Sequence, residues 1–231
     1  MRRILLSWSS GKDSAWALHV LRQQPEVEVA ALVTTFNEAV DRVAMHAVRR
    51  ELVEAQAEAA GLPLWPVMLP WPCSNEAYES RMREVLERGA REGVTHMAFG
   101  DLFLEDIRAY RINLLKGTGI EPLFPIWTSP DGTHALAREM VAAGLRAVIT
   151  CVDSRQLDPR FAGSQFHELL EQLPDGVDPC GERGEFHTFC YAGPMFRSSI
   201  DVSAGEVVCH EQFHFADLTR TASTGASRRR A

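Results

Sequence analysis

Several features common in other proteins are scarce or absent in this chain of 231 residues. No stretch approaches the ~20 uninterrupted apolar residues of a membrane span. The first apolar run ends at Ser7 after three residues, which is too short for a signal peptide. The five cysteines are odd in number and lack C-x-x-C spacing, so we expect reduced thiols without a disulfide framework. These absences predict a cytoplasmic protein without a membrane segment.

The two commonest glycine-rich nucleotide motifs are also missing. A P-loop ends in Gly-Lys-Ser/Thr, whereas here Asp13 follows the Gly-Lys pair. The nearest approach to G-x-G-x-x-G, at Gly117 and Gly119, has Pro122 where the third glycine should stand. Neither motif therefore explains how this chain would bind a nucleotide.

Lysine is scarce, and the charge balance is acidic. Only Lys12 and Lys116 among the 24 basic residues are lysines, which makes a lysine in a glycine-containing turn less likely to be incidental. The net charge of −7 argues against a broad nucleic-acid surface, so nucleic acid is an unlikely partner. Three arginines end the chain after a Ser/Thr/Gly/Ala-rich stretch, and we expect a disordered tail over residues 221–231.

Short apolar runs alternate with helical patterns in the first half of the chain. Strands are expected at residues 4–8, 29–35, 64–69 and 96–100. Helices are expected at residues 15–24, 43–60 and 74–92. Continuous apolar runs are typical of strands covered on both faces. The alternation of expected strands and helices predicts an α/β fold with a Rossmann-like parallel sheet and helices on both faces.

The rhythm changes after residue 127. A helix at 133–143 and a strand at 146–152 are followed by a loop-rich stretch containing four prolines. We predict one domain over residues 1–127 and a smaller α/β C-terminal lobe over residues 128–220.

The segment Ser9-Ser10-Gly11-Lys12-Asp13-Ser14 lies between the first expected strand and the first expected helix. Turn amides and a helix N-terminus together bind anions, so this segment predicts a phosphate site. The three serine hydroxyls can donate hydrogen bonds, and Lys12 supplies positive charge. Asp13 cannot usefully face a phosphate, so we expect it to hold Mg²⁺ or to fix the loop.

Ligands of parallel sheets bind beyond the carboxyl ends of the strands. This rule adds Ser7, Thr34, Gly100 and Asp101 to the expected nucleotide site. His46, near a helix start, is a further nucleotide contact or a buried structural histidine.

An acidic motif near residue 180 is the second candidate site. Glu182 and Glu185 lie in a glycine-rich segment, where they can bind a cationic group, hold Mg²⁺ or act as a base for an amine, unless the segment is a solvated turn. His187 stands nearby. Arg108 and Arg111 share one helix face, where they can neutralise pyrophosphate or form surface salt bridges.

The segment at residues 9–14 resembles the PP-loop, usually S-G-G-x-D-S, of the N-type ATP pyrophosphatases. Ser10 replaces the first glycine of that pattern, which is tolerable where its φ stays negative and strained otherwise. The resemblance implies an adenine nucleotide alpha hydrolase-like fold. It also implies that ATP binds with Mg²⁺ and is cleaved between the α- and β-phosphates.

Residues 181–188, Gly-Glu-Arg-Gly-Glu-Phe-His-Thr, resemble the G-E-x-G-E-[FY]-x-T motif of the diphthine–ammonia ligase family and its bacterial relatives. Residues 100–103 and 121–127 extend the resemblance over nearly the whole chain. It implies an ATP-dependent ligase that adenylates a substrate carboxylate, which ammonia or an amine then attacks. The ligase proper usually has Glu where this chain has His187, and tyrosine is common at Phe186.

The resemblance implies catalytic roles for Lys12, Asp13, Glu182 and Glu185, and substrate recognition by the acidic motif. A tRNA-modifying PP-loop enzyme is an alternative that needs a reactive cysteine. A non-catalytic nucleotide-binding or sensor protein is a second alternative. The sequence leaves open whether identical copies assemble.

Overall fold

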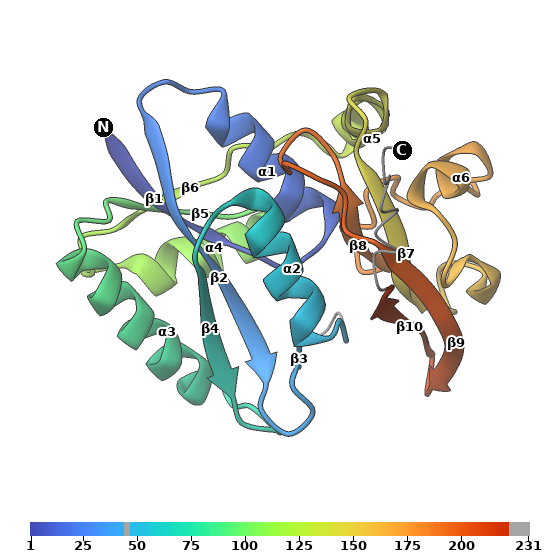
Figure 1. Cartoon of the computed structure of the whole chain (residues 1–231), viewed down its shortest axis with the longest axis horizontal. Helices are drawn as coiled ribbons and strands as arrows, with labels where there is room; N and C mark the ends of the chain where they lie inside the picture. Colours follow the sequence, from blue (N-terminus) through green and yellow to red (C-terminus); the bar gives the residue numbers. More distant parts are fainter. Residues whose placement is uncertain (44–46, 222–231) are drawn as a thin grey trace, which may run out of the picture.

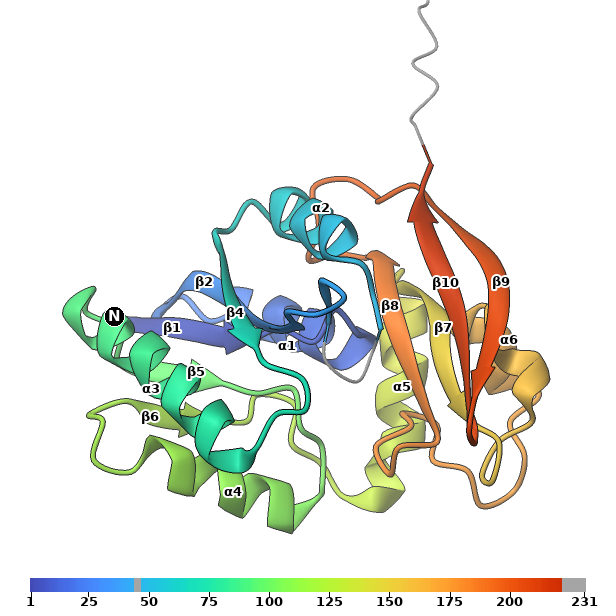
Figure 2. The ribbon, with the colours of Figure 1, turned by 90° about the horizontal axis from the view of Figure 1, so that it is seen from below.

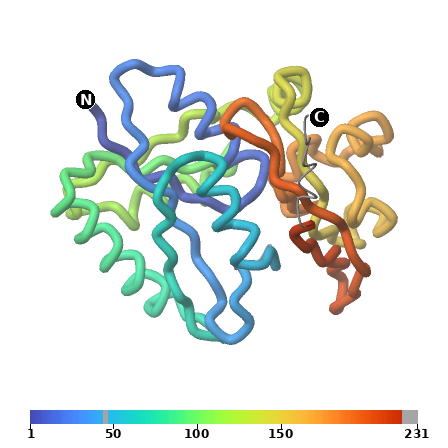
Figure 3. Tube along the Cα trace, in the orientation of Figure 1, coloured from blue at the N-terminus to red at the C-terminus, as the bar shows by residue number. Residues whose placement is uncertain are grey.

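The structure, a computed structural model, describes residues 1–43 and 47–221 (Figure 1). Two β-sheets lie side by side, and helices flank both of them (Figures 1 and 2). The continuous trace runs through the first sheet and its helices before it enters the second (Figure 3). None of the helices in the described ranges is long and apolar enough to cross a membrane.

The first sheet contains six strands of the described chain. They are β1 (Arg2–Ser7), β2 (Val27–Asn37), β3 (Arg42–Val43), β4 (Leu64–Leu69), β5 (His96–Ala98) and β6 (Glu121–Leu123). The order is β3-β2-β1-β5-β6, and β4 also pairs with β2. All pairings are parallel except that of β3.

Helices cover both faces of this sheet because its strands are apolar on both faces. The helices are α1 (Lys12–Arg22), α2 (Arg50–Ala60), α3 (Asn75–Arg91) and α4 (Glu105–Leu115). In β1, Ile4 and Leu6 share a core with α1 and α2, whereas Leu5 packs in a second core with α3 and α4. Successive strand side chains point to opposite faces, so one short apolar run builds both cores. The expected α/β fold class is confirmed.

The second sheet contains β7 (Arg146–Asp153), β8 (Phe186–Ala192), β9 (Val202–His210) and β10 (Phe213–Arg220). These strands are antiparallel in the order β8-β7-β10-β9, next to α5 (Thr133–Ala142) and α6 (Phe166–Glu171). Of the elements in this half, the sequence indicated α5 and β7. β8, β9 and β10 lie in or after the loop-rich stretch, and β9 is exposed at eight of its nine positions. The domain boundary at residue 128 stays a prediction.

One expected helix was wrong at its start. The helix expected over residues 43–60 is α2, which begins only at Arg50. Arg42 and Val43 instead form β3, which pairs with the end of β2. The cross-strand partner, which sequence periodicity does not contain, overrides the local helical pattern here.

The two sheets meet at the segment that follows β1. The backbone N–H of Cys190 in β8 donates to the Ser10 carbonyl at 2.9 Å. The backbone N–H of Lys12 donates to Thr188 Oγ1 at 3.1 Å. The expected phosphate loop is therefore held directly against a strand of the other sheet.

Candidate functional site

The two sequence motifs line one cavity of about 240 Å³ at this junction. Its walls come from six residues between Ser7 and Ser14, from residues 99–101, from Arg111 of α4 and from seven residues between Cys180 and Thr188. The first three groups belong to the parallel sheet or its helices, and the last leads into β8 of the antiparallel sheet. Residues some 170 positions apart in the chain thus share one site.

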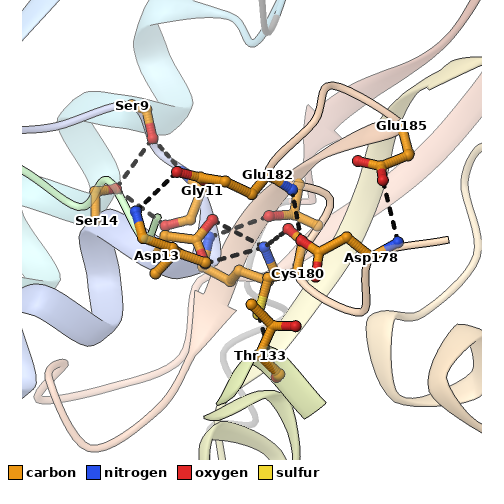
Figure 4. Close-up of polar contacts among 12 residues, drawn as sticks. Ser9, Gly11, Asp13, Ser14, Thr133, Asp178, Cys180, Glu182 and Glu185 are labelled. Carbon is orange, nitrogen blue, oxygen red and sulfur yellow. Dashed lines mark hydrogen bonds and ion pairs between the residues drawn. The ribbon is translucent and has the colours of Figure 1, made fainter. Parts of the chain in front are cut away.

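The serines at both ends of the phosphate loop tie it into a turn (Figure 4). Ser9 Oγ and Ser14 Oγ lie 3.2 Å apart, and Ser14 Oγ donates to the Gly11 carbonyl at 3.0 Å. Gly100 closes the loop from the side, because a Cβ there would lie only 2.9 Å from the Ser14 backbone nitrogen. Ser7, Ser9, Ser14, Gly100 and Asp101 all lie on the cavity wall, where the sequence placed them.

Ser10 differs from its expected role. It adopts φ +69°, in the left-handed region that the PP-loop pattern reserves for glycine. Its side chain is fully buried, and its Oγ has no hydrogen-bond partner among the described residues. The expectation that this hydroxyl faces the phosphate is wrong in this structure, because the backbone turns it away from the cavity.

Lys12 is a buried cation at the cavity. Its side chain is 2% exposed, and its Nζ lies 2.8 Å from Asp13 Oδ2. Nζ also donates to the Cys180 carbonyl and lies 5.4 Å from the centres of the Phe166 and Phe186 rings. Burial alone would lower the pKa of Lys12, but attraction to Asp13 outweighs it and the pKa is raised. Lys12 therefore stays charged at neutral pH.

Gln56 of α2 is a supporting residue that the sequence reasoning missed. Its Nε2 donates to the carbonyls of Ser10 at 2.9 Å and Cys190 at 2.6 Å. Its Oε1 accepts from Trp8 Nε1 at 2.8 Å. The available signal was a glutamine four residues after Leu52 on an otherwise apolar helix face.

The acidic motif is organised by Asp178, for which sequence reasoning predicted no role. Asp178 Oδ2 accepts from the Glu182 backbone N–H at 2.8 Å, while the Asp178 N–H donates to Glu185 Oε1 at 3.1 Å (Figure 4). Glu185 is buried and also accepts from the Arg183 N–H at 2.9 Å. The Glu185 carboxylate therefore holds the loop's own backbone, unlike the ligand contact that we expected.

Glu182 is the carboxylate of this motif that reaches the cavity. Its Oε1 accepts from the backbone N–H of Leu102 at 2.7 Å, which ties the motif to the segment after β5. Burial and the nearby charge of Asp13 raise the pKa of Glu182 to about 7, against the effect of the Leu102 hydrogen bond. A carboxyl with this pKa can accept a proton at neutral pH.

His187 lines the same cavity and is neutral. Burial, reinforced by the charge of Lys12, lowers the pKa of His187 to about 4. Burial also raises the thiol pKa of Cys180 and of Cys190, the two cysteines that flank the motif. These thiols therefore lack the thiolate character that sulfur transfer requires.

The two arginines of α4 have different surroundings. Arg111 lines the cavity, where its Nε lies 3.3 Å from Asp101 Oδ2 and its Nη1 donates to the Tyr78 hydroxyl at 3.3 Å. Arg108 is absent from the cavity wall and stacks 4.6 Å from the centre of the Trp127 ring. The structure thus brings only Arg111 to the candidate site.

A second cavity of about 510 Å³ adjoins the first and shares Ser7, Ser9 and Arg111 with it. It is lined largely by apolar and aromatic side chains, among them Trp71 and Tyr78. Thr35 lines this cavity, whereas the expected Thr34 is buried and donates to the Trp8 carbonyl at 2.8 Å. The expectation for Thr34 was one residue off, because adjacent strand side chains point to opposite faces.

His46 lies outside the described residues. The described residues contain no group of three or more His, Cys, Asp or Glu side chains arranged to hold a metal ion. Asp13, Asp101 and Glu182 line the first cavity individually. Such carboxylates suit Mg²⁺ only if a ligand completes its oxygen shell.

Comparison with known families explains why these two motifs occur together. A model of the diphthamide synthase N-terminal domain matches residues 1–120, and one of the C-terminal domain matches residues 132–224. The chain belongs to the diphthamide synthase family. The family resemblance found in the sequence is thereby confirmed.

Individual members of the diphthamide synthase family show the same relationship over most of the chain. The diphthine–ammonia ligase of Mus musculus is 28% identical over 94% of this chain and 88% of its own length. The Homo sapiens protein of the same name is 27% identical over the same shares. The Schizosaccharomyces pombe protein is 24% identical over 87% of this chain, which is 36% of the yeast protein.

Proposed function

We propose that this chain is an ATP-dependent amide-forming ligase that releases AMP and pyrophosphate. The observation that carries the proposal is the shared cavity, in which the phosphate loop and the acidic motif face each other. The phosphate loop suits ATP, and the acidic motif suits a nitrogen nucleophile. Relatives of this chain are named diphthine–ammonia ligases, and the name describes the joining of ammonia to diphthine.

In this proposal, ATP occupies the two adjoining cavities, with its phosphates in the smaller one. The smaller cavity holds Lys12 and the loop amides, so it suits the β- and γ-phosphates. The larger, mostly apolar cavity suits the nucleoside. The α-phosphate then lies at the shared wall, beside Ser7, Ser9 and Arg111.

The proposed reaction has two steps. A substrate carboxylate oxygen attacks the α-phosphorus, and the bond to the bridging oxygen breaks so that pyrophosphate leaves with the electron pair. Ammonia or an amine then attacks the acyl carbon and displaces AMP. Lys12 stabilises the charge that develops on pyrophosphate, and Arg111 stabilises the α-phosphate, once its ion pair with Asp101 opens.

Glu182 is the proposed base. The nitrogen must lose a proton as it forms the amide, and Glu182 faces the cavity with a pKa of about 7. Glu185 holds the loop that presents Glu182 and does not itself touch the substrate. Asp13 would hold Mg²⁺ together with the nucleotide phosphates, and the ion would supply charge neutralisation there.

The acidic motif differs at one position from that of the ligase proper, beside the expected substrate site. Where that enzyme usually has Glu, this chain has the neutral His187 on the cavity wall. We propose a carboxylate on a small molecule or a protein, with ammonia or an amine as the nitrogen source. The cytoplasmic location expected from the sequence remains part of the proposal.

The decisive experiment incubates the protein with α-labelled ATP, Mg²⁺, ammonium and a panel of carboxylates, a diphthine-bearing protein included. AMP is the expected labelled product, whereas ADP would contradict cleavage between the α- and β-phosphates. Arg111→Ala should lower kcat/KM about 100-fold, because one charge beside the reacting phosphate is lost. Arg108→Ala on the same helix is the matched control and should have little effect.

The alternative of a non-catalytic nucleotide-binding protein makes a different prediction. Calorimetry would then show ATP or AMP binding that Asp13→Ala abolishes, with no AMP formed with any carboxylate. The sulfur-transfer alternative is disfavoured by the buried thiols of Cys180 and Cys190.

A further inference from the structure

The outermost strand of the antiparallel sheet is an open edge. β9 (Val202–His210) pairs only with β10 among the described strands, and Figure 2 shows it at the outer side of the sheet. Eight of its nine residues are exposed, including Val207 at 46% and Val208 at 57%. One edge of the strand therefore offers unpaired backbone groups over nine residues.

This edge carries few of the protections that isolated edge strands usually have. The register of β9 against β10 shifts once, between Ala216 and Leu218, so the strand is irregular beside Gly205. Its sequence, Val-Ser-Ala-Gly-Glu-Val-Val-Cys-His, contains no proline, lysine or arginine, and its acidic and basic side chains are Glu206 and His210. Val208 lies opposite Phe215 of β10, which extends the apolar row onto the next strand. An edge of this length and composition is normally covered by another strand.

We propose that β9 pairs with β9 of a second copy of this chain, antiparallel across a two-fold axis at Val208. The strand is complementary to itself in this register. Val208 faces its own counterpart, Val207 faces Cys209, and each Glu206 carboxylate faces a His210 imidazole that can donate to it. On one face the row Phe215, Val208, Val208, Phe215 then crosses the axis.

Neighbouring registers fit less well. Centring the axis on Glu206 would oppose two carboxylates, and centring it on Val207 would set each Val208 against a Glu206. The Val208 register alone among these three gives three apolar contacts and two polar pairs. It joins the two four-stranded sheets into one continuous sheet and places the β8 side of each copy, with its cavity, away from the axis.

Light scattering and sedimentation of the full chain across a concentration series test the proposal. The wild type should dimerise, and Glu206→Lys should raise the dimer Kd about tenfold or more, because Lys then faces His210. The double exchange Glu206→Lys with His210→Glu should restore dimerisation. Far-UV circular dichroism confirms that each variant is folded.

A crosslinking pair tests the register itself. In a Cys209→Ser background, Val208→Cys should form a disulfide-linked dimer, because facing residues of an antiparallel pair lie about 4.5–5.5 Å apart at Cα. Glu206→Cys in the same background is the matched control, because its two copies would lie about 13 Å apart.

Several outcomes would overturn the proposal. One is a wild type that stays monomeric up to a concentration of about 100 µM. Another is a dimer whose Kd is unchanged by Glu206→Lys. A third is a double exchange that fails to restore dimerisation. Equal crosslinking of both cysteine variants would also overturn the proposal. Dimerisation that appears only after removal of residues 222–231 would indicate that this segment, and not a second copy, covers the β9 edge of the full chain.

Discussion

At the scale of single residues, the candidate site depends on side chains whose surroundings change their chemistry. The ion pair with Asp13 keeps Lys12 charged despite its burial. Burial makes His187 a neutral ring and raises the pKa of Glu182 to about 7. Ser10 shows the opposite case, in which a polar side chain in the loop has no partner among the described residues. Two predictions follow from Ser10 and Glu182 at this scale.

Ser10→Gly should stabilise the protein by about 1 kcal/mol, because it relieves a left-handed backbone conformation and removes a buried hydroxyl without a partner. ATP affinity should be unchanged, since the hydroxyl does not reach the cavity. Thermal and urea unfolding measure the first effect and calorimetry the second. Ser10→Ala is the control that removes the hydroxyl and keeps φ strained; a less stable glycine variant would contradict the prediction.

Glu182→Gln should abolish the rise of kcat/KM with pH that the wild type shows between about pH 6 and 8. The carboxylate is the proposed base and forms as pH passes its pKa of about 7. Stability should change in the opposite sense. Because folding raises this pKa, the wild type loses stability as pH rises through 7, whereas the glutamine variant does not.

Melting temperatures at pH 5.5 and pH 8 check this second effect. The melting temperature of the Glu182→Gln variant relative to the wild type should be higher at pH 8 than at pH 5.5. Glu84→Gln on the exposed face of α3 is the matched control and should show no such trend. A wild-type rate independent of pH in this range would exclude Glu182 as the base.

At the scale of elements, α2 connects the phosphate loop to the second sheet. Its glutamine binds the Ser10 carbonyl and the Trp8 indole, both in the segment after β1, and the Cys190 carbonyl of β8. The helix therefore positions the loop without contributing to the cavity wall. Gln56 therefore positions the phosphate loop and does not contact the ligand site itself.

Gln56→Leu should lower the free energy of unfolding by about 2–4 kcal/mol, because it leaves buried carbonyls and an indole N–H without partners. It should also weaken ATP binding, since the Ser10 turn loses a support. Urea unfolding and calorimetry are the measurements. Glu58→Leu, exposed on the same helix, is the control. Equal free energies of unfolding for both variants would show that the hydrogen bonds of Gln56 do not stabilise the fold.

At the scale of the whole molecule, the site exists only where the two sheets meet, and ion pairs reinforce that junction. Asp217 of β10 accepts hydrogen bonds from Arg42 of β3 at 2.9 Å and from Arg49, just before α2, at 2.5 Å. These contacts lie apart from the cavity, so they should affect stability more than chemistry.

Asp217→Ala should lower the free energy of unfolding by about 1 kcal/mol at pH 7, the usual scale for a partly exposed ion pair. The hydrogen bond from Arg49, with help from Arg42, lowers the pKa of Asp217. A lowered folded pKa gives stability that is present at neutral pH and is lost as pH falls below about 4. The difference from wild type should therefore shrink in acid and in high salt.

Urea unfolding at pH 7 and pH 3 measures the Asp217 effect. Asp175→Ala, at an exposed loop position, is the control and should be neutral. A destabilisation that persists unchanged at pH 3 would mean that packing, and not the ion pairs, is lost.

The sequence by itself determined the parallel sheet, its flanking helices and most of the phosphate loop. These follow from local patterns: short apolar runs, a glycine-containing turn and helical periodicity. Residues 9–14 and 181–188 could be recognised as motifs for the same reason, because their residue types stand next to each other in the chain. Family membership rests on these segments and on the matches over both halves of the chain.

Only the tertiary structure decided which of those residues face the cavity. The Ser10 side chain is buried away from the cavity, and the Glu185 carboxylate binds the backbone of its own loop. Arg111 and not Arg108 reaches the site, and Gln56 supports it from a helix that carries no motif. The physical reason is that these outcomes depend on φ, burial and partners far apart in the chain. Neither the spacing of residues nor their type contains that information.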